Sequence, residues 1–381
     1  MNSLNTIPFN PYIVGNPIIN QEMFFGRDNE FNYIKEKFSN TENGLILTLA
    51  GERRSGKTSI LFQILNGRLG FGFLPIFIDM QAMAGIENTF QFLARIASII
   101  GKTTANNELV GASNSIDFEG FALIIEHLVK ENGTSRIIIM VDEYEIIEKK
   151  IEEGIFDVDI ISFCARLIDD FNILFLFTGS NNLENRQSSY WKAVLNKSYN
   201  KKIPYLTEDE CNDLISTPLK QYIKFTVQQF KKIFRLSAGQ PYYTQLICQR
   251  FVDLLIVEKR TEIMDGDIDE AVLNILESPL LPMIYFWREF NEYQIFCLSL
   301  LSQAITEIGP LMETEILWAF IEKKDLTKKI NETQFAATLN ELHTKEILIK
   351  REGKFCFRMD FFRLWIQQEQ SLWKVVSEIG L

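Results

Sequence analysis

The stretch "GERRSGKTSI", residues 51–60, is the feature that most restricts how this chain of 381 residues can fold. It follows the apolar run "LILTLA" and precedes "LFQIL", so a glycine-rich, cationic loop separates a predicted strand from a predicted helix. The pattern G-x-x-x-x-G-K-[ST] is met by Gly51, Gly56, Lys57 and Thr58. Glycines let the backbone N–H groups approach phosphate oxygens, and the helix adds its positive N-terminal end. The loop therefore predicts a phosphate site rather than an ordinary turn.

The side chains of this loop suit a nucleotide with its metal ion. Lys57 would bridge the β- and γ-phosphates, and Thr58 would offer its hydroxyl to Mg²⁺. For Arg53 and Arg54 the sequence leaves three contacts open: a phosphate, a neighbouring subunit or water. We assign the following further loop residues to the nucleotide site: Arg54, Ser55 and Ser59.

A phosphate loop needs a partner for its metal on a neighbouring strand, and "RIIIMVDEYE" supplies one. Asp142 would hold the hydration shell of Mg²⁺, and Glu143 would polarise the attacking water. The alternative is an acidic pair that simply ends a strand at the surface. Glu143 favours catalysis, because nucleotide binding does not require a second carboxylate whereas hydrolysis does.

A third apolar strand, "NILFLFTGSNN", ends in small polar residues. It is expected to lie between the strand before the phosphate loop and the strand that ends at Asp142. Ser180 or Asn181 would then point at the γ-phosphate. A polar loop without a sensing role is the alternative.

Continuous apolar runs alternate with amphipathic segments, which predicts an α/β fold with a parallel sheet and helices on both faces. A helix is expected from Asp28, with Asp28 as its cap, and a mobile loop is expected over 102–116. The predicted strands are Leu45–Ala50, Leu74–Ile78, Ile137–Val141 and Ile173–Phe177.

After Ile203 the pattern becomes helical. Thr207 and Glu210 form a capping-box signature, and two prolines near residue 280 mark a linker. Three helical patterns and a hairpin, "EILIKREGKFCFRM", then suggest a winged-helix unit. The predicted parts are an extended N-terminal arm (1–22), a P-loop nucleotide-binding domain (23–205), a helical lid domain (206–282) and a winged-helix domain (283–381).

Composition excludes several classes of protein. The formal net charge of −11 argues against a general nucleic-acid coat or a membrane-surface protein, since both need a basic surface. The five cysteines are scattered and form no C-x-x-C pair, so neither a zinc site nor a disulfide framework is indicated. With no apolar run near 20 residues and no hydrophobic leader, we expect a cytoplasmic protein without a membrane segment.

Taken together, these pieces resemble STAND-type P-loop ATPases of the archaeal-ATPase-like branch, which are relatives of AAA+ proteins. The matching segments are "NPYIVGNPI", "MFFGRDNEF", "GERRSGKTS", "IIIMVDEYE", "FLFTGSNN", "IPYLTEDECNDLISTPL" and "SAGQPYYTQLIC", of which the "FFGR" and "GQP" features are the most specific. The resemblance implies that Gly26 and Arg27 lie beside the base and ribose, and that Pro241 lies near the adenine. The alternative for Arg27 is a surface residue without a nucleotide contact. The alternative for Pro241 is a residue of the first helical turn, where proline is common for conformational reasons alone. ATP is preferred to GTP by resemblance alone.

The resemblance favours an ATP-hydrolysing switch that closes its lid and winged-helix domains on ATP. It would act through a separate effector protein or as a homo-oligomer, in a setting such as bacterial defence or signalling. The alternative is a DNA-binding AAA+-like ATPase, a replication or transposition helper whose wing uses "KRE" and Lys354. A third hypothesis is a scaffold that holds ATP without hydrolysing it.

Overall fold

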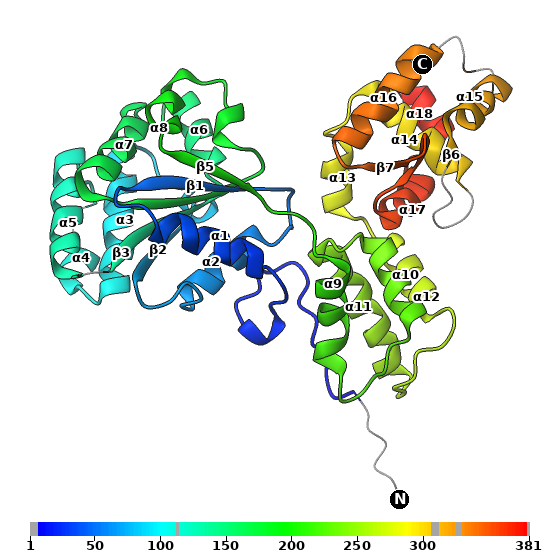
Figure 1. Ribbon diagram of the computed structural model, residues 1–381, viewed down its shortest axis with the longest axis horizontal. Coiled ribbons are helices and arrows are strands. Elements are labelled where there is room, and N and C mark those ends of the chain that lie inside the picture. The colour runs from blue at the N-terminus through cyan, green and yellow to red at the C-terminus, as the bar shows by residue number, and fades with distance from the viewer. Residues whose placement is uncertain are drawn as a thin grey trace, which may run out of the picture. The chain divides into compact units, whose positions relative to one another are not determined.

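The computed structural model describes residues 7–111, 114–133, 135–305, 312–324, 326 and 330–378. The chain forms two compact units (Figure 1). One is Gly15–Pro204, and the other combines Met1–Val14 with Tyr205–Leu381. They are described below as the nucleotide unit and the helical unit.

The nucleotide unit contains a parallel sheet of five strands in the order β2-β3-β4-β1-β5. Strand β4, which contains the "FLFTG" of the run "NILFLFTGSNN", lies between β1 and β3 as expected. Strand β5 was not predicted, because "SYNKK" is polar and only partly buried at the edge of the sheet. The strands are β1 (Leu45–Ala50), β2 (Phe73–Asp79), β3 (Arg136–Asp142), β4 (Leu174–Gly179) and β5 (Ser198–Lys202).

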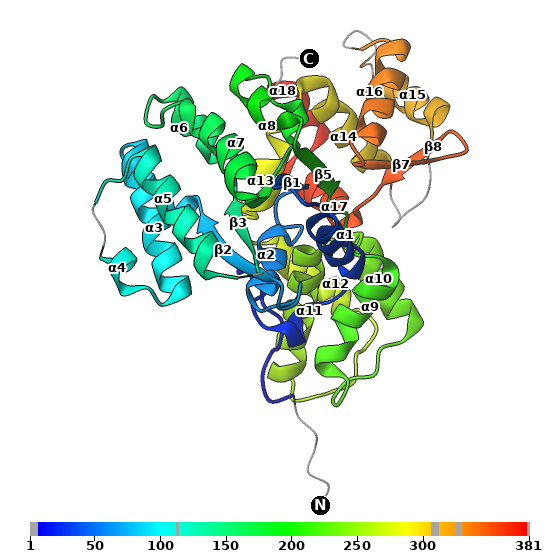
Figure 2. The same cartoon turned by 60° about the vertical axis from the view of Figure 1, so that its left-hand side comes forward.

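Helices cover both faces of this sheet, which confirms the expected α/β architecture (Figure 2). Alternate residues of a strand point to opposite faces. In β3, for example, Ile137 and Ile139 join one hydrophobic core, and Ile138 and Met140 join the other. The helices are α1 (Asp28–Ser39), α2 (Lys57–Leu65), α3 (Thr89–Thr104), α4 (Asn107–Val110), α5 (Phe118–Glu131), α6 (Glu145–Glu152), α7 (Asp159–Phe171) and α8 (Lys192–Leu195).

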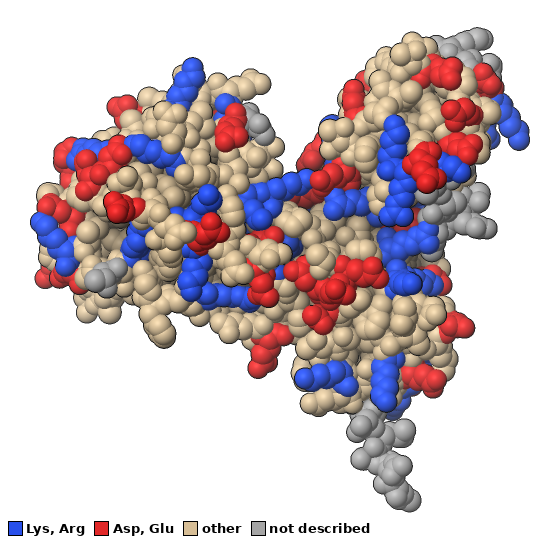
Figure 3. All heavy atoms as spheres, viewed as in Figure 1, with Lys and Arg blue, Asp and Glu red and all other residues tan. Residues whose placement is uncertain are grey.

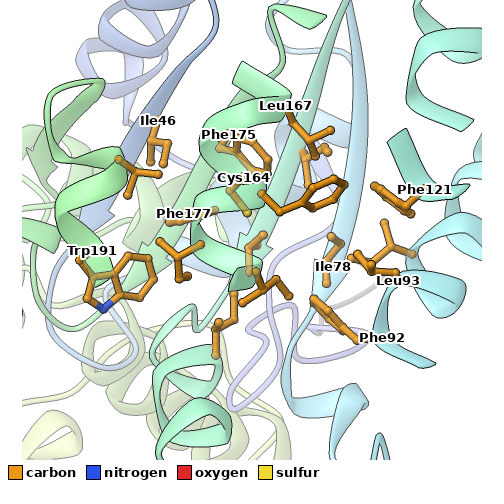
Figure 4. A pocket seen from close by; sticks show the side chains of 18 residues that line it. Ile46, Ile78, Phe92, Leu93, Phe121, Cys164, Leu167, Phe175, Phe177 and Trp191 are labelled. Carbon is orange, nitrogen blue, oxygen red and sulfur yellow. The ribbon is translucent and has the colours of Figure 1, made fainter. Parts of the chain in front are cut away.

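The larger of the two cores encloses a cavity of about 40 Å³ (Figure 4). Its lining is entirely apolar and includes Phe92, Cys164, Phe177 and Trp191. A buried water needs two to four polar partners, which this cavity does not offer. The cavity is therefore a dry packing defect, and no residue of the phosphate loop lines it.

Two local expectations were wrong. Helix α1 is capped by Arg27, with a left-handed φ of 72°, rather than by Asp28, which is its first residue. The segment 102–116 is not wholly a loop, because α3 continues to Thr104 and α4 follows behind an Asn106 cap. Residues 112 and 113 of that segment lie outside the described residues.

The helical unit confirms the expected hairpin and capping box. The linker expected near residue 280 is in part wrong, because Pro282 lies in the first turn of a helix, α13. Thr207 accepts from the Glu210 backbone, while the Glu210 carboxylate accepts from the Thr207 backbone. Helices α14 to α16 and the three-stranded sheet β6-β8-β7 have winged-helix order. The elements are α9 (Glu208–Ser216), α10 (Val227–Ser237), α11 (Pro241–Val257), α12 (Asp267–Leu276), α13 (Leu281–Trp287), α14 (Glu292–Ala304), β6 (Met312–Glu313), α15 (Thr314–Lys323), α16 (Glu332–Thr344), β7 (Leu348–Arg351), β8 (Lys354–Phe357), α17 (Asp360–Glu369) and α18 (Leu372–Glu378).

The described part of the N-terminal arm is extended but anchored in both units. Asn10 donates to the Gln249 carbonyl at 2.8 Å and to Asp253 at 2.7 Å in the helical unit. In the nucleotide unit, the Ile18 amide donates to Ser59 at 2.9 Å. No helix in the described ranges combines the length and apolar character needed to cross a membrane.

Close packing at the start of β1 generates a test of this fold. A Cβ at Gly44 would lie 2.4 Å from the Ile173 carbonyl and 2.8 Å from the Ile168 carbonyl, so the backbone would have to move. We expect Gly44→Ala to destabilise the protein by about 1–3 kcal/mol, measured by thermal and denaturant unfolding. Gly72→Ala is the control, since nothing lies within 4 Å of its added Cβ. Equal stability of the two variants would contradict this packing.

Candidate active site

The loop between β1 and α2 has the backbone geometry that phosphate binding requires. A Cβ at Gly51 would lie 3.0 Å from the Ile203 carbonyl, so a side chain there would displace β5 or the loop. Gly56 has a φ of 95° and precedes α2 without any side-chain cap. The first N–H groups of α2 therefore remain uncapped by a side chain, which is the feature that anions use at helix N-termini.

Lys57 lies over this loop. Its Nζ donates to the carbonyls of Gly51 and Glu52, each at 2.8 Å. Burial lowers the pKa of Lys57, while the carboxylates of Asp142, Glu145 and Glu143 act against that shift. A phosphate would act in the same direction as these carboxylates, so nucleotide binding favours the charged ammonium.

The structure brings Thr58 and Asp142 together. The Thr58 hydroxyl donates to Asp142 Oδ2 at 2.7 Å, which joins the phosphate loop to the end of β3. The second oxygen, Oδ1, accepts from Thr178 on the intervening strand β4. Asp142 is 7% exposed, and both its oxygens have partners. Side chains from α2 and from the neighbouring strand β4 thus fix this carboxylate at the carboxyl end of β3.

These oxygens fit a magnesium ion. In the described part of the chain, no group of three or more His, Cys, Asp or Glu side chains could hold a metal. Mg²⁺ usually takes one or two protein ligands, with phosphates and waters completing its coordination. The hydroxyl of Thr58 and the carboxylate of Asp142 match that limited donor set.

Glu143 adopts a left-handed backbone, with φ 56°, so the chain turns sharply directly after Asp142. Such a conformation is unfavourable for a non-glycine residue and persists only where the surroundings enforce it. Glu143 Oε2 accepts from Gln81 Nε2 at 2.7 Å. Gln81 follows β2 and was missed by the sequence analysis, because the adjacency of β2 and β3 cannot be read from the sequence order.

Arg27 is a buried residue, 3% exposed, which rules out the surface alternative. Its guanidinium donates to the Ser55 carbonyl at 3.0 Å and to the Pro204 carbonyl at 2.7 Å. The side chain therefore supports the phosphate loop and the end of the nucleotide unit. A contact with the base or ribose stays a prediction.

The remaining predicted residues have more varied surroundings. Ser59 is engaged by the N-terminal arm, and Arg54 is exposed with a φ of 64°. The Ser180 hydroxyl donates to Glu145 at 2.8 Å. Pro241 begins α11 in the helical unit, behind a Gln240 cap. The γ-phosphate role of Ser180 and the adenine contact of Pro241 stay predictions.

Comparisons with known proteins agree with this fold. Residues 24–247 match the family described as "ATPase domain predominantly from Archaea". No match was found among curated protein sequences. The Walker-type ATPase PABY2304 of Pyrococcus abyssi is similar in structure, with a TM-score of 0.61 and 14% identity over 93% of this chain and 99% of that one. The ORC2 protein of Aeropyrum pernix, in its ADPNP-ADP complexes, has a TM-score of 0.57 and 12% identity over 98% of each chain.

The family match covers more than half of the sequence and includes the phosphate loop and the acidic pair. The structural neighbours independently show the P-loop ATPase fold. The chain therefore belongs to the family of ATPase domains found predominantly in Archaea, and it is an ATPase.

Proposed function

We propose that this ATPase is a nucleotide-operated switch of the STAND type. The observation that carries the proposal is the 2.7 Å hydrogen bond from Thr58 to Asp142, which assembles the two halves of a triphosphate site. ATP is the proposed substrate. The ADPNP-ADP complexes of the Aeropyrum pernix protein support an adenine nucleotide, although at 12% identity that protein shares only the fold.

Each residue of the site has a separate role in the proposed hydrolysis of ATP. Thr58 and Asp142 would hold Mg²⁺, which supplies neutralising charge to the β- and γ-phosphates. Lys57 and the uncapped N-terminus of α2 stabilise negative charge on the phosphates. Glu143 orients the attacking water and accepts its proton as the water oxygen bonds the γ-phosphorus and the bond to ADP breaks. Gln81 holds Glu143 through the 2.7 Å hydrogen bond described above.

The chain between the two units supports a switch. The Ile203 amide donates to the Ala50 carbonyl at 2.7 Å, directly before the phosphate loop. Three residues later, the Leu206 amide donates to the Gly239 carbonyl at 2.9 Å, directly before Gln240 and Pro241. Two backbone hydrogen bonds, joined by the short segment from Ile203 to Leu206, thus lead from the phosphate loop to the turn that begins α11. A shift of the loop can be transmitted along this path.

The N-terminal arm provides a second connection, which joins α2 to α11 through hydrogen bonds at both ends of the segment from Tyr12 to Ile18. On α2 it contacts Ser59, and Gln63 donates to the Ile18 carbonyl at 3.0 Å. On α11, Gln245 accepts from the Ile13 amide at 3.1 Å, and Gln249 donates to the Tyr12 carbonyl at 3.2 Å. Both paths therefore connect the helix of the phosphate loop with the helix that carries Pro241.

We infer that the output of the switch is a protein contact, with an effector or with a second copy, rather than a DNA contact. In winged-helix order, α16 is the helix that would enter a DNA groove. It contains two glutamates and neither lysine nor arginine. Lysines of the wing are engaged locally, Lys350 with Asn340 at 2.7 Å and Lys354 with Glu313 at 2.9 Å. Acidic side chains accompany basic ones on the face of both units shown in Figure 3.

The phosphate loop gives a matched pair of glycine variants. Gly56→Ala and Gly67→Ala place a side chain at φ values of 95° and 85°, with nothing within 4 Å of either added Cβ. We expect Gly56→Ala to weaken ATP binding about 10-fold or more, because the strained loop realigns its N–H groups. Gly67→Ala should lose only stability. Titration calorimetry measures the ATP affinity and thermal unfolding measures the stability. Equal ATP affinity in both variants would argue against phosphate binding by the loop at residues 51–58.

The catalytic assignment is tested by ATP turnover. Lys57→Ala should weaken nucleotide binding about 10- to 100-fold through loss of charge-assisted contacts. Glu143→Gln should bind ATP normally and lose about 10²–10⁴-fold in kcat, since the amide cannot accept the proton. Equal turnover by the wild type and both variants would refute this mechanism. The Glu143→Gln protein should also retain its protein partner longest, which pull-down experiments with and without ATP can measure.

The DNA alternative makes a distinct prediction about salt. In a plot of the logarithm of the DNA-binding constant against the logarithm of the salt concentration, each DNA phosphate neutralised by the protein contributes about −0.9 to the slope. We expect duplex binding too weak to show such a slope, measured by fluorescence anisotropy. A steep slope that is reduced in a Lys350→Gln, Lys354→Gln double variant would instead favour DNA binding through the wing.

A further inference from the structure

A third carboxylate, Glu145, lies beside the acidic pair and faces the loop that follows β4. Glu145 Oε1 accepts from the Ser180 amide at 2.5 Å, from the Ser180 hydroxyl at 2.8 Å and from the Asn181 amide at 3.4 Å. A Cβ at Gly179 would lie 2.5 Å from both oxygens of this carboxylate, so the glycine leaves the space that Glu145 occupies. Glu145 therefore fixes the loop predicted to meet the γ-phosphate.

The charge of Glu145 is opposed by Arg186. Arg186 Nη2 lies 3.1 Å from Glu145 Oε1, as a charge contact rather than an aligned hydrogen bond. The guanidinium is held from its other side, because Nη1 donates to Glu148 at 2.6 Å and Nε donates to the Tyr144 hydroxyl at 3.1 Å. Arg186 is thus fixed in place by partners on α6 and the preceding turn.

Tyr144 completes the link to the same loop. It is fully buried, and its hydroxyl donates to the Asn181 carbonyl at 2.9 Å. Burial is the main cause that raises the pKa of Tyr144 to about 12, so the hydroxyl keeps its proton at neutral pH. Glu148, 8% exposed, also accepts from Trp191 at 3.2 Å. The pair Glu145–Arg186 therefore belongs to a rigid, largely buried network rather than to a flexible surface.

Glu145 also acts on the phosphate loop. The loop that Glu145 holds is joined to the phosphate loop, because the Gly51 amide donates to the Gly179 carbonyl at 3.1 Å, directly before Ser180. A carboxylate that holds this neighbour of the phosphate loop repels an anionic triphosphate bound there. The balance between Glu145 and Arg186 therefore influences how strongly ATP binds.

We propose that Glu145 and Arg186 form a charge-compensated positioning pair of the ATPase site. Glu145 positions the Ser180–Asn181 loop, and Arg186, which also pairs with Glu148, offsets part of the charge of Glu145 so that the loop can be held with less repulsion of ATP. This inference rests on the proposed function, since it requires ATP at residues 51–58. Neither side chain exchanges a proton or forms a bond with the substrate.

The proposal predicts KM shifts of opposite sign for the two partners. Glu145→Gln keeps an acceptor for the Ser180 and Asn181 groups but removes the charge, so KM for ATP should fall about 2- to 5-fold while kcat stays within about 3-fold. Arg186→Gln leaves the carboxylate uncompensated, so KM should rise about 3- to 10-fold. The double variant should return KM close to that of the wild type. Glu145→Ala should lower kcat about 10-fold, because it also removes the acceptor.

Controls separate this role from a purely structural one. Arg186→Lys preserves the charge and should leave KM near the wild-type value, even if thermal unfolding shows lost stability from the contacts with Glu148. Glu153→Gln changes an exposed acid that pairs with Lys149 at 3.7 Å near the end of α6, and it should change neither constant. KM shifts in the same direction for Glu145→Gln and Arg186→Gln, or no shift in either, would overturn the proposal.

Lys57→Ala separates a failure of the proposed ATP site from a failure of the Glu145–Arg186 proposal alone. Unchanged ATP affinity and turnover in Lys57→Ala would remove the ATP site at residues 51–58, and with it both the proposed function and the pair. Loss of ATP binding in Lys57→Ala, together with unshifted KM values in the other variants, would remove the charge-compensated pair alone.

Discussion

The hydrogen bond between Thr58 and Asp142 is the contact on which this structure depends most. It crosses from the first turn of α2 to the end of β3, although β4 lies between β1 and β3 in the sheet. Thr178 on β4 holds the other oxygen of the same carboxylate. Because parallel strands present their carboxyl ends at one edge, a single buried aspartate on β3 can tie its own strand to β4 and to α2 there. The phosphate loop is positioned by the same sheet that forms the core.

The sequence predicted most of the fold because apolar strands and helices leave strong periodic signals. Strands β1 to β4 of the nucleotide unit are apolar runs, and each lies within about two residues of its expected bounds. Strand β5 lacks that signal, because its sequence "SYNKK" is polar and its side chains are only partly buried. Its side chains are fixed by neighbours instead, with Lys37 over the Tyr199 ring at 4.5 Å. The cap of α1 was mispredicted because an arginine bound to two carbonyls replaces the usual side-chain cap.

The candidate site was predictable only in part, because only some of its residues belong to local sequence patterns. Spacing along the chain indicates the phosphate loop and the acidic pair, because each is a local pattern next to a strand. The partners of these residues come from other strands and loops. Gln81 meets Glu143 through the adjacency of β2 and β3, and Arg186 meets Glu145 across the turn after β4. Such contacts depend on strand order and loop conformation, which no local spacing encodes.

Asp142, Glu143 and Glu145 are three of the four carboxylates that act on Lys57, and the mutual repulsion of these three has to be balanced. Each has its own partner: two threonines hold Asp142, Gln81 holds Glu143, and Arg186 faces Glu145. Only the last of these partners is charged. A neutral partner leaves the charge of Asp142 available to a metal ion and that of Glu143 available to a water. The cation beside Glu145, which is shared with Glu148, offsets part of the charge of a residue whose position, rather than its basicity, is useful. The choice of partner therefore distinguishes the carboxylates that act on the substrate from the one that holds the loop.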